Sequence, residues 1–343
     1  MKYSKNLPNI RETEYKKEEI LALTSVYYGM KMNLTVNENE TAIQDLHCSE
    51  RLLGINQKII ISAFNIPLSI TALLGNILMI IALQKPSSLH PSSKLLFGCL
   101  TITDLCVGLI AQPLRVTYLM SPEQSELCYH AWVLYNTLGL IFCGVSLLTL
   151  TTISVDRLLA LMLGLRYKHL VTLRRVWVVV VILWLSIIAI VIIIYYNFSV
   201  SDFVVSTILL LCIIVSTCCY TKIYLALRKC QLQVHAHQTR PNRAYSGQSE
   251  RSTLLNTARY KKSVSSALCV QLTLVACYLP FGLVIALFAI TRRNAPSIDL
   301  AWEISLFVLL LNSSLNPFIY CWKIREIRLA VMDIISQFCC CLR

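Results

Sequence analysis

Long apolar runs separated by short polar segments dominate the chain from about residue 58 onward. A helix needs roughly 20 mostly apolar residues to cross about 30 Å of hydrocarbon, and runs of that length indicate membrane spans. The spans are expected at about 58–84, 95–120, 129–161, 176–197, 203–229, 264–290 and 299–322. The pattern therefore predicts an all-α membrane protein built as a bundle of seven transmembrane helices.

The polar segments that flank these spans divide the chain into three parts. We expect residues 1–57 to form a disordered extracellular segment, residues 58–322 the membrane bundle, and residues 323–343 a cytoplasmic tail. The first twenty residues lack the apolar stretch of a signal peptide, so the first span is expected to direct insertion. Residues 1–30 are also open to interpretation as an over-extended start, because Met30 and Met32 follow them.

Composition and charge fit this division. Of the 343 residues, 56% are hydrophobic and 14% are charged, whereas soluble domains are about 25% charged. The net charge of +13 lies mainly in the first, third and fifth connections and in the tail, which places these segments in the cytoplasm. We therefore expect a plasma-membrane protein with its N-terminus outside, its C-terminus inside, and basic loops that face lipid headgroups and a cytosolic partner rather than nucleic acid.

Several positions outside the spans are candidates for modification. Three Asn-X-Ser/Thr patterns on the predicted outer side are candidate glycosylation sites: Asn33, Asn39 and Asn197. Residues 323–338 carry apolar residues at the spacing of one helix face and charged residues on the other, as an amphipathic helix does. The cysteines that follow are either palmitoylation sites or an unmodified run: Cys339, Cys340 and Cys341.

Polar residues inside the apolar spans are the strongest functional signal. Asp104 lies near the centre of the second span, where an ionisable group is costly and usually functional. A tolerated, protonated carboxyl is the alternative, but amides in spans 1 and 7 offer partners. The pair Asp156-Arg157 closes the third span, and apolar residues continue beyond it, so Arg157 is expected to lie against the bundle. Four prolines permit kinks that are either static or hinges: Pro67, Pro113, Pro280 and Pro317.

Ordered landmarks in all seven spans resemble class A, rhodopsin-like G protein-coupled receptors over roughly residues 58–341. They are Gly75-Asn76, Leu100 with Asp104, Asp156-Arg157-Leu158, Trp184, Tyr220, Cys277-Tyr278-Leu279-Pro280 and Asn316-Pro317-Phe318-Ile319-Tyr320. A very short second outer loop, and Cys212 where most members have proline, resemble the melanocortin, cannabinoid and lysophospholipid branch, with adenosine receptors nearby.

The resemblance implies a non-enzymatic receptor that binds an extracellular ligand within the bundle. It would activate a heterotrimeric G protein through the inner ends of spans 3, 5, 6 and 7, with arrestin and a receptor kinase as further partners. The implied activation residues are Asp156, Arg157, Tyr220, Pro280, Asn316, Pro317 and Tyr320. In such a receptor Arg157 would swing toward Tyr220 and Tyr320, and Pro280 would act as the pivot. The implied polar core, which would hold a sodium ion near Asp104, is Asn76, Asp104, Ser146, Asn312 and Asn316.

The chain also departs from the pattern of this family. The usual disulfide between span 3 and the second outer loop lacks its loop cysteine here, and we expect a Cys48–Cys128 bridge instead. Tyr278 replaces a tryptophan, Leu158 replaces a tyrosine, and Tyr260 replaces a glutamate that restrains the span 3 arginine. These differences predict raised basal activity.

The ligand remains unidentified, but two classes are disfavoured. Gly139 replaces the acid that pairs with amine ligands, and Leu310 replaces the lysine of retinal proteins. Leu114, Trp132 and Asn136 stand where melanocortin receptors use acids to hold calcium. Arg115 is expected either to meet an anionic ligand group or to snorkel to the headgroups. The expected ligand pocket is mostly apolar, and the alternative is that the same residues form ordinary helix-packing core. These residues are Arg115, Gly139, Leu140, Cys143, Tyr278, Phe281, Leu306 and Leu310.

Two other functional classes compete with the receptor reading. A seven-helix transporter or channel is the main alternative, but the spans show a single mid-membrane acid and no evident inverted repeat. A membrane enzyme is disfavoured because H-E-x-x-H, a nucleophile elbow and paired carboxylates are absent from the spans. The fifth connection carries candidate phosphorylation sites for desensitisation: Ser246, Ser249, Ser252 and Thr253.

Overall fold

The computed structural model describes residues 54–85, 90–122, 125–196, 201–238, 269, 271–287, 296–323 and 325–341. Several predicted features lie outside these residues. They are the segment 1–30, the glycosylation candidates Asn33, Asn39 and Asn197, Cys48, Tyr260, and the loop sites Ser246, Ser249, Ser252 and Thr253. The predictions made for them stay predictions.

The described chain is helical throughout and contains no strand. The long helices coincide with the predicted spans to within a few residues at most ends. They are α3 (Ile55–Gln84), the continuous α4 (Pro91–Cys106), η1 (Val107–Ala111) and α5 (Gln112–Met120), then α6 (Glu126–Leu163), α8 (Leu173–Tyr196), α9 (Ser201–Gln238) and α11 (Pro296–Lys323). These six are long and apolar enough to cross a membrane, and Gln271–Leu287 is a shorter apolar helix in the described part. We refer to Gln271–Leu287 as the sixth helix.

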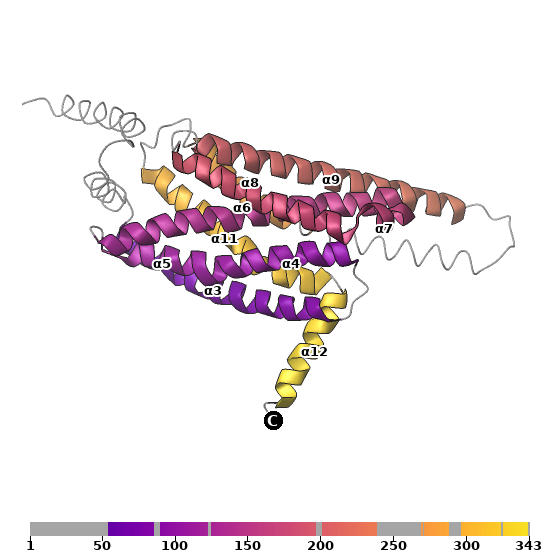
Figure 1. Ribbon diagram of the computed structural model, residues 1–343, viewed down its shortest axis with the longest axis horizontal. Coiled ribbons are helices and arrows are strands. Elements are labelled where there is room, and N and C mark those ends of the chain that lie inside the picture. The colour runs from indigo at the N-terminus through magenta and orange to yellow at the C-terminus, as the bar shows by residue number, and fades with distance from the viewer. Residues whose placement is uncertain are drawn as a thin grey trace, which may run out of the picture.

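The long helices run side by side as one bundle (Figure 1). The central helix is α6, which packs against α4, α5, α8 and α9. On the outside, α8 exposes most of its apolar side chains, as a helix does when lipid covers it. In the following, outer and inner ends refer to the orientation predicted from the charges.

The second span contains a wide turn that the apolar pattern did not predict. Residues Val107–Ala111 form a π-helix, the segment η1, which ends two residues before Pro113. The carbonyl of Gly108 accepts a hydrogen bond of 2.6 Å from Ser69 Oγ of α3. A Cβ added at Gly108 would lie 2.8 Å from the Cβ of Ala72. The bulge therefore brings spans 1 and 2 together at a place where only glycine fits, and it accommodates a proline that cannot donate to the helix.

A second close approach joins α9 to the sixth helix. A Cβ added at Gly282 would lie 2.7 Å from Cδ2 of Leu209. Gly282 follows Pro280 by two residues, so the two helices touch beside the expected pivot.

Inner connections and the tail add three short elements. After α6 come η2 (Gly164–Arg166) and α7 (Tyr167–Leu170), and after α11 comes α12 (Arg325–Cys341). Figure 1 shows α12 leaving the bundle at one end and pointing away from it. Its Ile327, Val331 and Ile334 are buried, whereas Ile335 is exposed. Lys85, at the end of span 1, forms an ion pair with Asp333 of this helix.

Candidate functional site

The predicted polar core assembles around Asp104, which is completely buried. Ser146 Oγ in α6 donates a hydrogen bond of 3.2 Å to its Oδ1. Asn316 Nδ2 in α11 donates one of 2.7 Å to its Oδ2. Three spans therefore meet at one carboxyl group, which explains how a costly acid is held at membrane depth.

Span 1 joins this core through backbone and packing contacts. Asn76 Nδ2 donates to the carbonyls of Ala72 at 2.8 Å and Ser313 at 3.1 Å. The neighbouring Gly75 lies against Pro317, since a Cβ added there would be 3.0 Å from the proline Cγ. The motifs of spans 1 and 7, far apart in the sequence, thus lie together.

Asn312 shows where the core is incomplete. It is 1% exposed, yet neither its Oδ1 nor its Nδ2 has a hydrogen-bond partner among the described residues. Carboxylate, amide and hydroxyl oxygens are the ligands that hard cations prefer. Asp104, Ser146 and Asn312 carry oxygens of these kinds, and the oxygen of Asn312 is unengaged in the described chain.

At the inner end of α6, Asp156 receives three polar contacts. Arg157 Nη2 lies 3.0 Å from its Oδ2 as an ion pair. Ser93 Oγ donates to Oδ2 at 3.1 Å, and the hydroxyl of Tyr167 in α7 donates to Oδ1 at 2.5 Å. Burial, together with the hydrogen bond to Asp156, raises the pKa of Tyr167 to about 12, so this hydroxyl stays protonated. Residues from span 2 and the inner loop therefore orient the carboxylate that holds Arg157.

Phe97 of α4 connects the arginine to span 7. The guanidinium carbon of Arg157 lies 5.8 Å from the Phe97 ring centroid, within range of a cation–π contact. The same ring meets Tyr320 edge to face at 5.0 Å. Sequence reasoning missed Phe97 because one aromatic in an apolar span looks like ordinary core.

The two tyrosines expected to meet Arg157 occupy separate places. Tyr220 packs with Ile223 and Leu227 of α9 against α6. Tyr320 is buried, and its hydroxyl has no partner in the described part of the chain. Among the described residues, Arg157 makes no hydrogen bond to either tyrosine. The arrangement holds Arg157 close to Asp156.

Most of the predicted pocket residues face the interior from α6, from α11 and from the sixth helix (Gln271–Leu287). The hydroxyl of Tyr278 donates to the carbonyl of Cys143 at 3.4 Å. The ring of Phe281 lies 5.2 Å from that of Trp302. Leu310 packs with Phe142 and Val107. Of the remaining candidates, Leu306 packs on the main core, while Gly139 and Leu140 are half-buried and belong to no core cluster.

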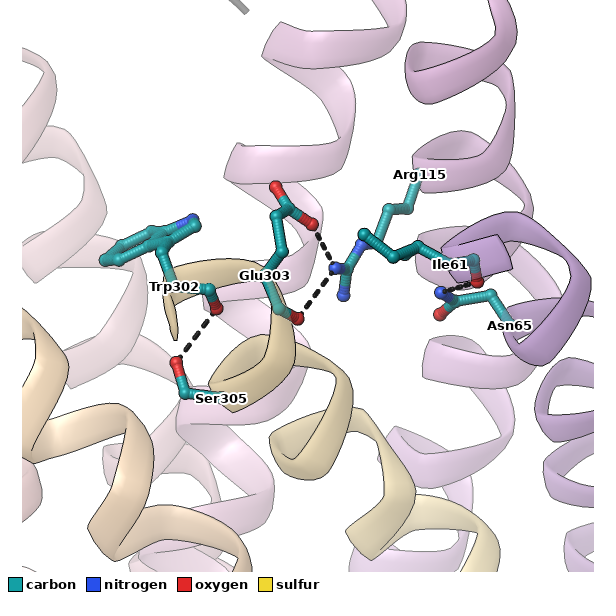
Figure 2. A network of polar contacts seen from close by, with 6 residues as sticks. All are labelled: Ile61, Asn65, Arg115, Trp302, Glu303 and Ser305. Atoms are coloured by element: carbon teal, nitrogen blue, oxygen red, sulfur yellow. Dashed lines mark hydrogen bonds and ion pairs between the residues drawn. The ribbon is translucent and has the colours of Figure 1, made fainter. Parts of the chain in front are cut away.

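Of the two environments predicted for Arg115, the structure contradicts the headgroup one. It is 1% exposed, so it does not snorkel to the headgroups. Its Nη2 donates to the carboxylate of Glu303 in α11 and to the backbone carbonyl of the same residue at 3.2 Å (Figure 2). Its charge is thus balanced inside the protein. Glu303 escaped the sequence analysis because acids near the end of a span are common.

Cys128 is disulfide-bonded, in agreement with its predicted place on the oxidising side. The identity of the partner lies outside the described residues, and the pairing with Cys48 stays a prediction. The tail cysteines Cys339, Cys340 and Cys341 fall at the end of α12, where their side chains are not among those described.

Comparison with known proteins agrees with this geometry. The family model described as 7 transmembrane receptor (rhodopsin family) matches residues 75–206 and 194–320. Melanocortin receptor 5 of Mus musculus is 25% identical over 321 residues, which cover 90% of this chain and 93% of that receptor. The same receptor of Rattus norvegicus is 24% identical over the same shares. The chain therefore belongs to the rhodopsin family of seven-transmembrane receptors, the class A G protein-coupled receptors, and has melanocortin-like character.

Proposed function

We propose that this receptor binds an extracellular ligand within its bundle and activates a heterotrimeric G protein through the inner ends of spans 3, 5, 6 and 7. The observation that carries the proposal is the restrained arginine. Arg157 is paired with Asp156, which Ser93 and Tyr167 hold in turn. A charge held by a few polar contacts is a two-state element that a ligand can bias.

The aromatic contacts of Phe97 support the same proposal. Because its ring touches both Arg157 and Tyr320, movement of span 7 would alter the surroundings of the arginine. A ligand shifts such an equilibrium only by its difference in affinity for the two states. Ligand contacts near Phe281 and Leu306 would supply that difference from the outer side.

A sodium ion is the second part of the proposal. Asp104, Ser146 and Asn312 would hold it, and its charge would stabilise the inactive packing of spans 2, 3 and 7. Asn312 supports this assignment because its buried amide has no partner among the described residues.

The experiment is ligand-free coupling to a panel of G proteins in cells, with Arg157→Ala matched for surface level. We expect basal coupling in the parent receptor and a loss of at least tenfold in the variant. The control is Arg175→Ala, which should retain coupling. Arg175 also lies at the inner end of the bundle, and in the described chain it bonds only the carbonyl of Leu170. Unchanged coupling in Arg157→Ala would contradict the assigned role.

A further inference from the structure

Buried polar atoms without partners gather at the outer ends of spans 1 and 2. Asn65, Gln112 and Arg115 are between 0% and 1% exposed. Among the described residues, four of their atoms lack a hydrogen bond: Asn65 Oδ1, Gln112 Oε1 and Nε2, and Arg115 Nη1. Native proteins satisfy nearly all buried polar groups, and a bilayer offers no water in exchange. These atoms therefore indicate a partner from outside the described residues.

The three residues lie on two helices that pack together. Gln112 and Arg115 are three residues apart and so share a face of α5, and α3 packs along that helix. Figure 2 shows Asn65 on the side of the Arg115 guanidinium that faces away from Glu303. Asn65 Nδ2 is engaged by the carbonyl of Ile61 at 2.8 Å, which leaves its oxygen as the available atom.

The charges of the site point to an uncharged ligand group. Glu303 already balances Arg115, and Lys58, further out on α3, has a partner of its own. An additional carboxylate or ammonium would be left without a counter-charge in an environment of low dielectric constant, which is costly. An ionic ligand group is therefore disfavoured here.

The count of donors and acceptors narrows the chemistry further. The unpaired donors are Gln112 Nε2 and Arg115 Nη1, and the unpaired acceptors are Gln112 Oε1 and Asn65 Oδ1. The hydroxyl of Ser62, three residues before Asn65 on α3, is also buried and unpaired in the described chain and can serve as either. A primary carboxamide offers two N–H donors and a carbonyl oxygen with two lone pairs. We propose that this site binds the uncharged carboxamide group of an otherwise apolar ligand, whose apolar part lies inward toward Leu306. This inference rests on the proposed function in assuming a ligand within the bundle.

The test uses full-length receptor in phosphatidylcholine nanodiscs and measures its thermal unfolding midpoint. Probes with the same apolar chain are oleamide, oleate, oleylamine and 1-octadecene at equal membrane fraction. An N-acetylated apolar dipeptide amide and its free acid test a peptide source for the same group. A ligand that binds only the folded state raises the midpoint by mass action. We expect an amide to raise it and its matched acid and hydrocarbon to leave it unchanged.

Gln112→Leu is the decisive variant. Because its amide has no partner in the described chain, its loss should not lower the midpoint of the ligand-free receptor. We expect at least tenfold more amide to be needed for the same shift. Gln271→Leu removes another buried amide, which bonds Thr217 in the inner half, and should respond as the parent does. Stabilisation by oleamide alone indicates a lipid source, and by the dipeptide amide a peptide source.

The proposal is overturned if no amide stabilises the parent receptor, which would leave water as the occupant. It is also overturned if oleate acts as well as oleamide, or if Gln112→Leu responds like the parent. No G protein is present in this measurement. Failure of basal coupling with the amide shift intact would therefore count against the proposed function and not against this site.

Discussion

Among single residues, Asp156 shows how this receptor restrains its arginine. The carboxylate accepts hydrogen bonds from Ser93 and Tyr167 while it pairs with Arg157. Tyr260 occupies the position at which related receptors carry a restraining glutamate, and it lies outside the described residues. The restraint seen in the described part therefore comes from span 2 and the inner loop.

Tyr167→Phe should raise basal coupling. It removes a hydrogen bond to a charged group, worth about 1.5–3 kcal/mol, and so loosens the carboxylate that holds Arg157. Since about 1.4 kcal/mol changes an equilibrium tenfold, we expect a rise of roughly tenfold or more in ligand-free G protein coupling. Tyr195→Phe, on an exposed tyrosine near the outer end of α8, should leave coupling unchanged. Equal or lower coupling in Tyr167→Phe would refute this role.

How far the sequence predicts a residue's role depends on how unusual that residue is in its span. Asp104 was predicted because an acid among apolar residues has few explanations, and Asn316 of span 7 was predicted as a partner. Ser146 followed only from the resemblance to class A receptors. The ion pair of Arg115 was not predicted, since its partner Glu303 lies 188 positions away and nothing local indicates the pair. Phe97 was missed because its contacts depend on how spans 2, 3 and 7 pack.

At the scale of helices, the apolar runs predicted the spans well and their irregularities poorly. Length and hydropathy determine where a span lies, and the observed ends follow them. The π-helix at Val107–Ala111 leaves no trace in the apolar pattern except the proline that follows. Its position is set by the contact of Gly108 with span 1, which is a tertiary interaction.

Gly108→Ala should destabilise the receptor. The new methyl group would overlap Ala72 of the neighbouring helix, and overpacking of this kind costs about 1–3 kcal/mol. Gly98→Ala in the same span is the matched control, because its Cβ would meet nothing within 4 Å, and alanine favours a helix by about 0.5–1 kcal/mol. Thermal unfolding of the purified receptor in detergent should therefore show opposite shifts. A lowered midpoint for both variants would argue against the packing explanation.

At the scale of the whole molecule, the buried polar groups tie the spans together in separate layers. The outer layer joins spans 2 and 7 through Arg115 and Glu303. The middle layer joins spans 1, 2, 3 and 7 around Asp104. The inner layer joins spans 2 and 3 and the loop at Asp156. Span 2 contributes to all three layers, so a change at one layer can reach the next through this helix.

Sodium should lower basal coupling through the middle layer. Replacing sodium by N-methylglucamine should raise ligand-free nucleotide exchange on the G protein by roughly fivefold or more, the usual lower range of coupling between two sites. Asp104→Asn removes the charge that would hold the ion, so its exchange rate should not respond to sodium. A parent receptor that is insensitive to sodium would exclude the ion from this layer.

The close approach at Gly282 has a mechanical consequence. The sixth helix can rotate about its contact with Leu209 of α9 at Gly282. The segment on the Phe281 side of this contact is short, and the segment toward the inner end is long. Gln271 lies eleven residues from Gly282, or about 16 Å at about 1.5 Å per residue. A rotation of about 20° would then move that end by about 6 Å, within the range of known hinge motions. Lever length would thus turn a small displacement at a ligand into an opening large enough to admit a protein partner.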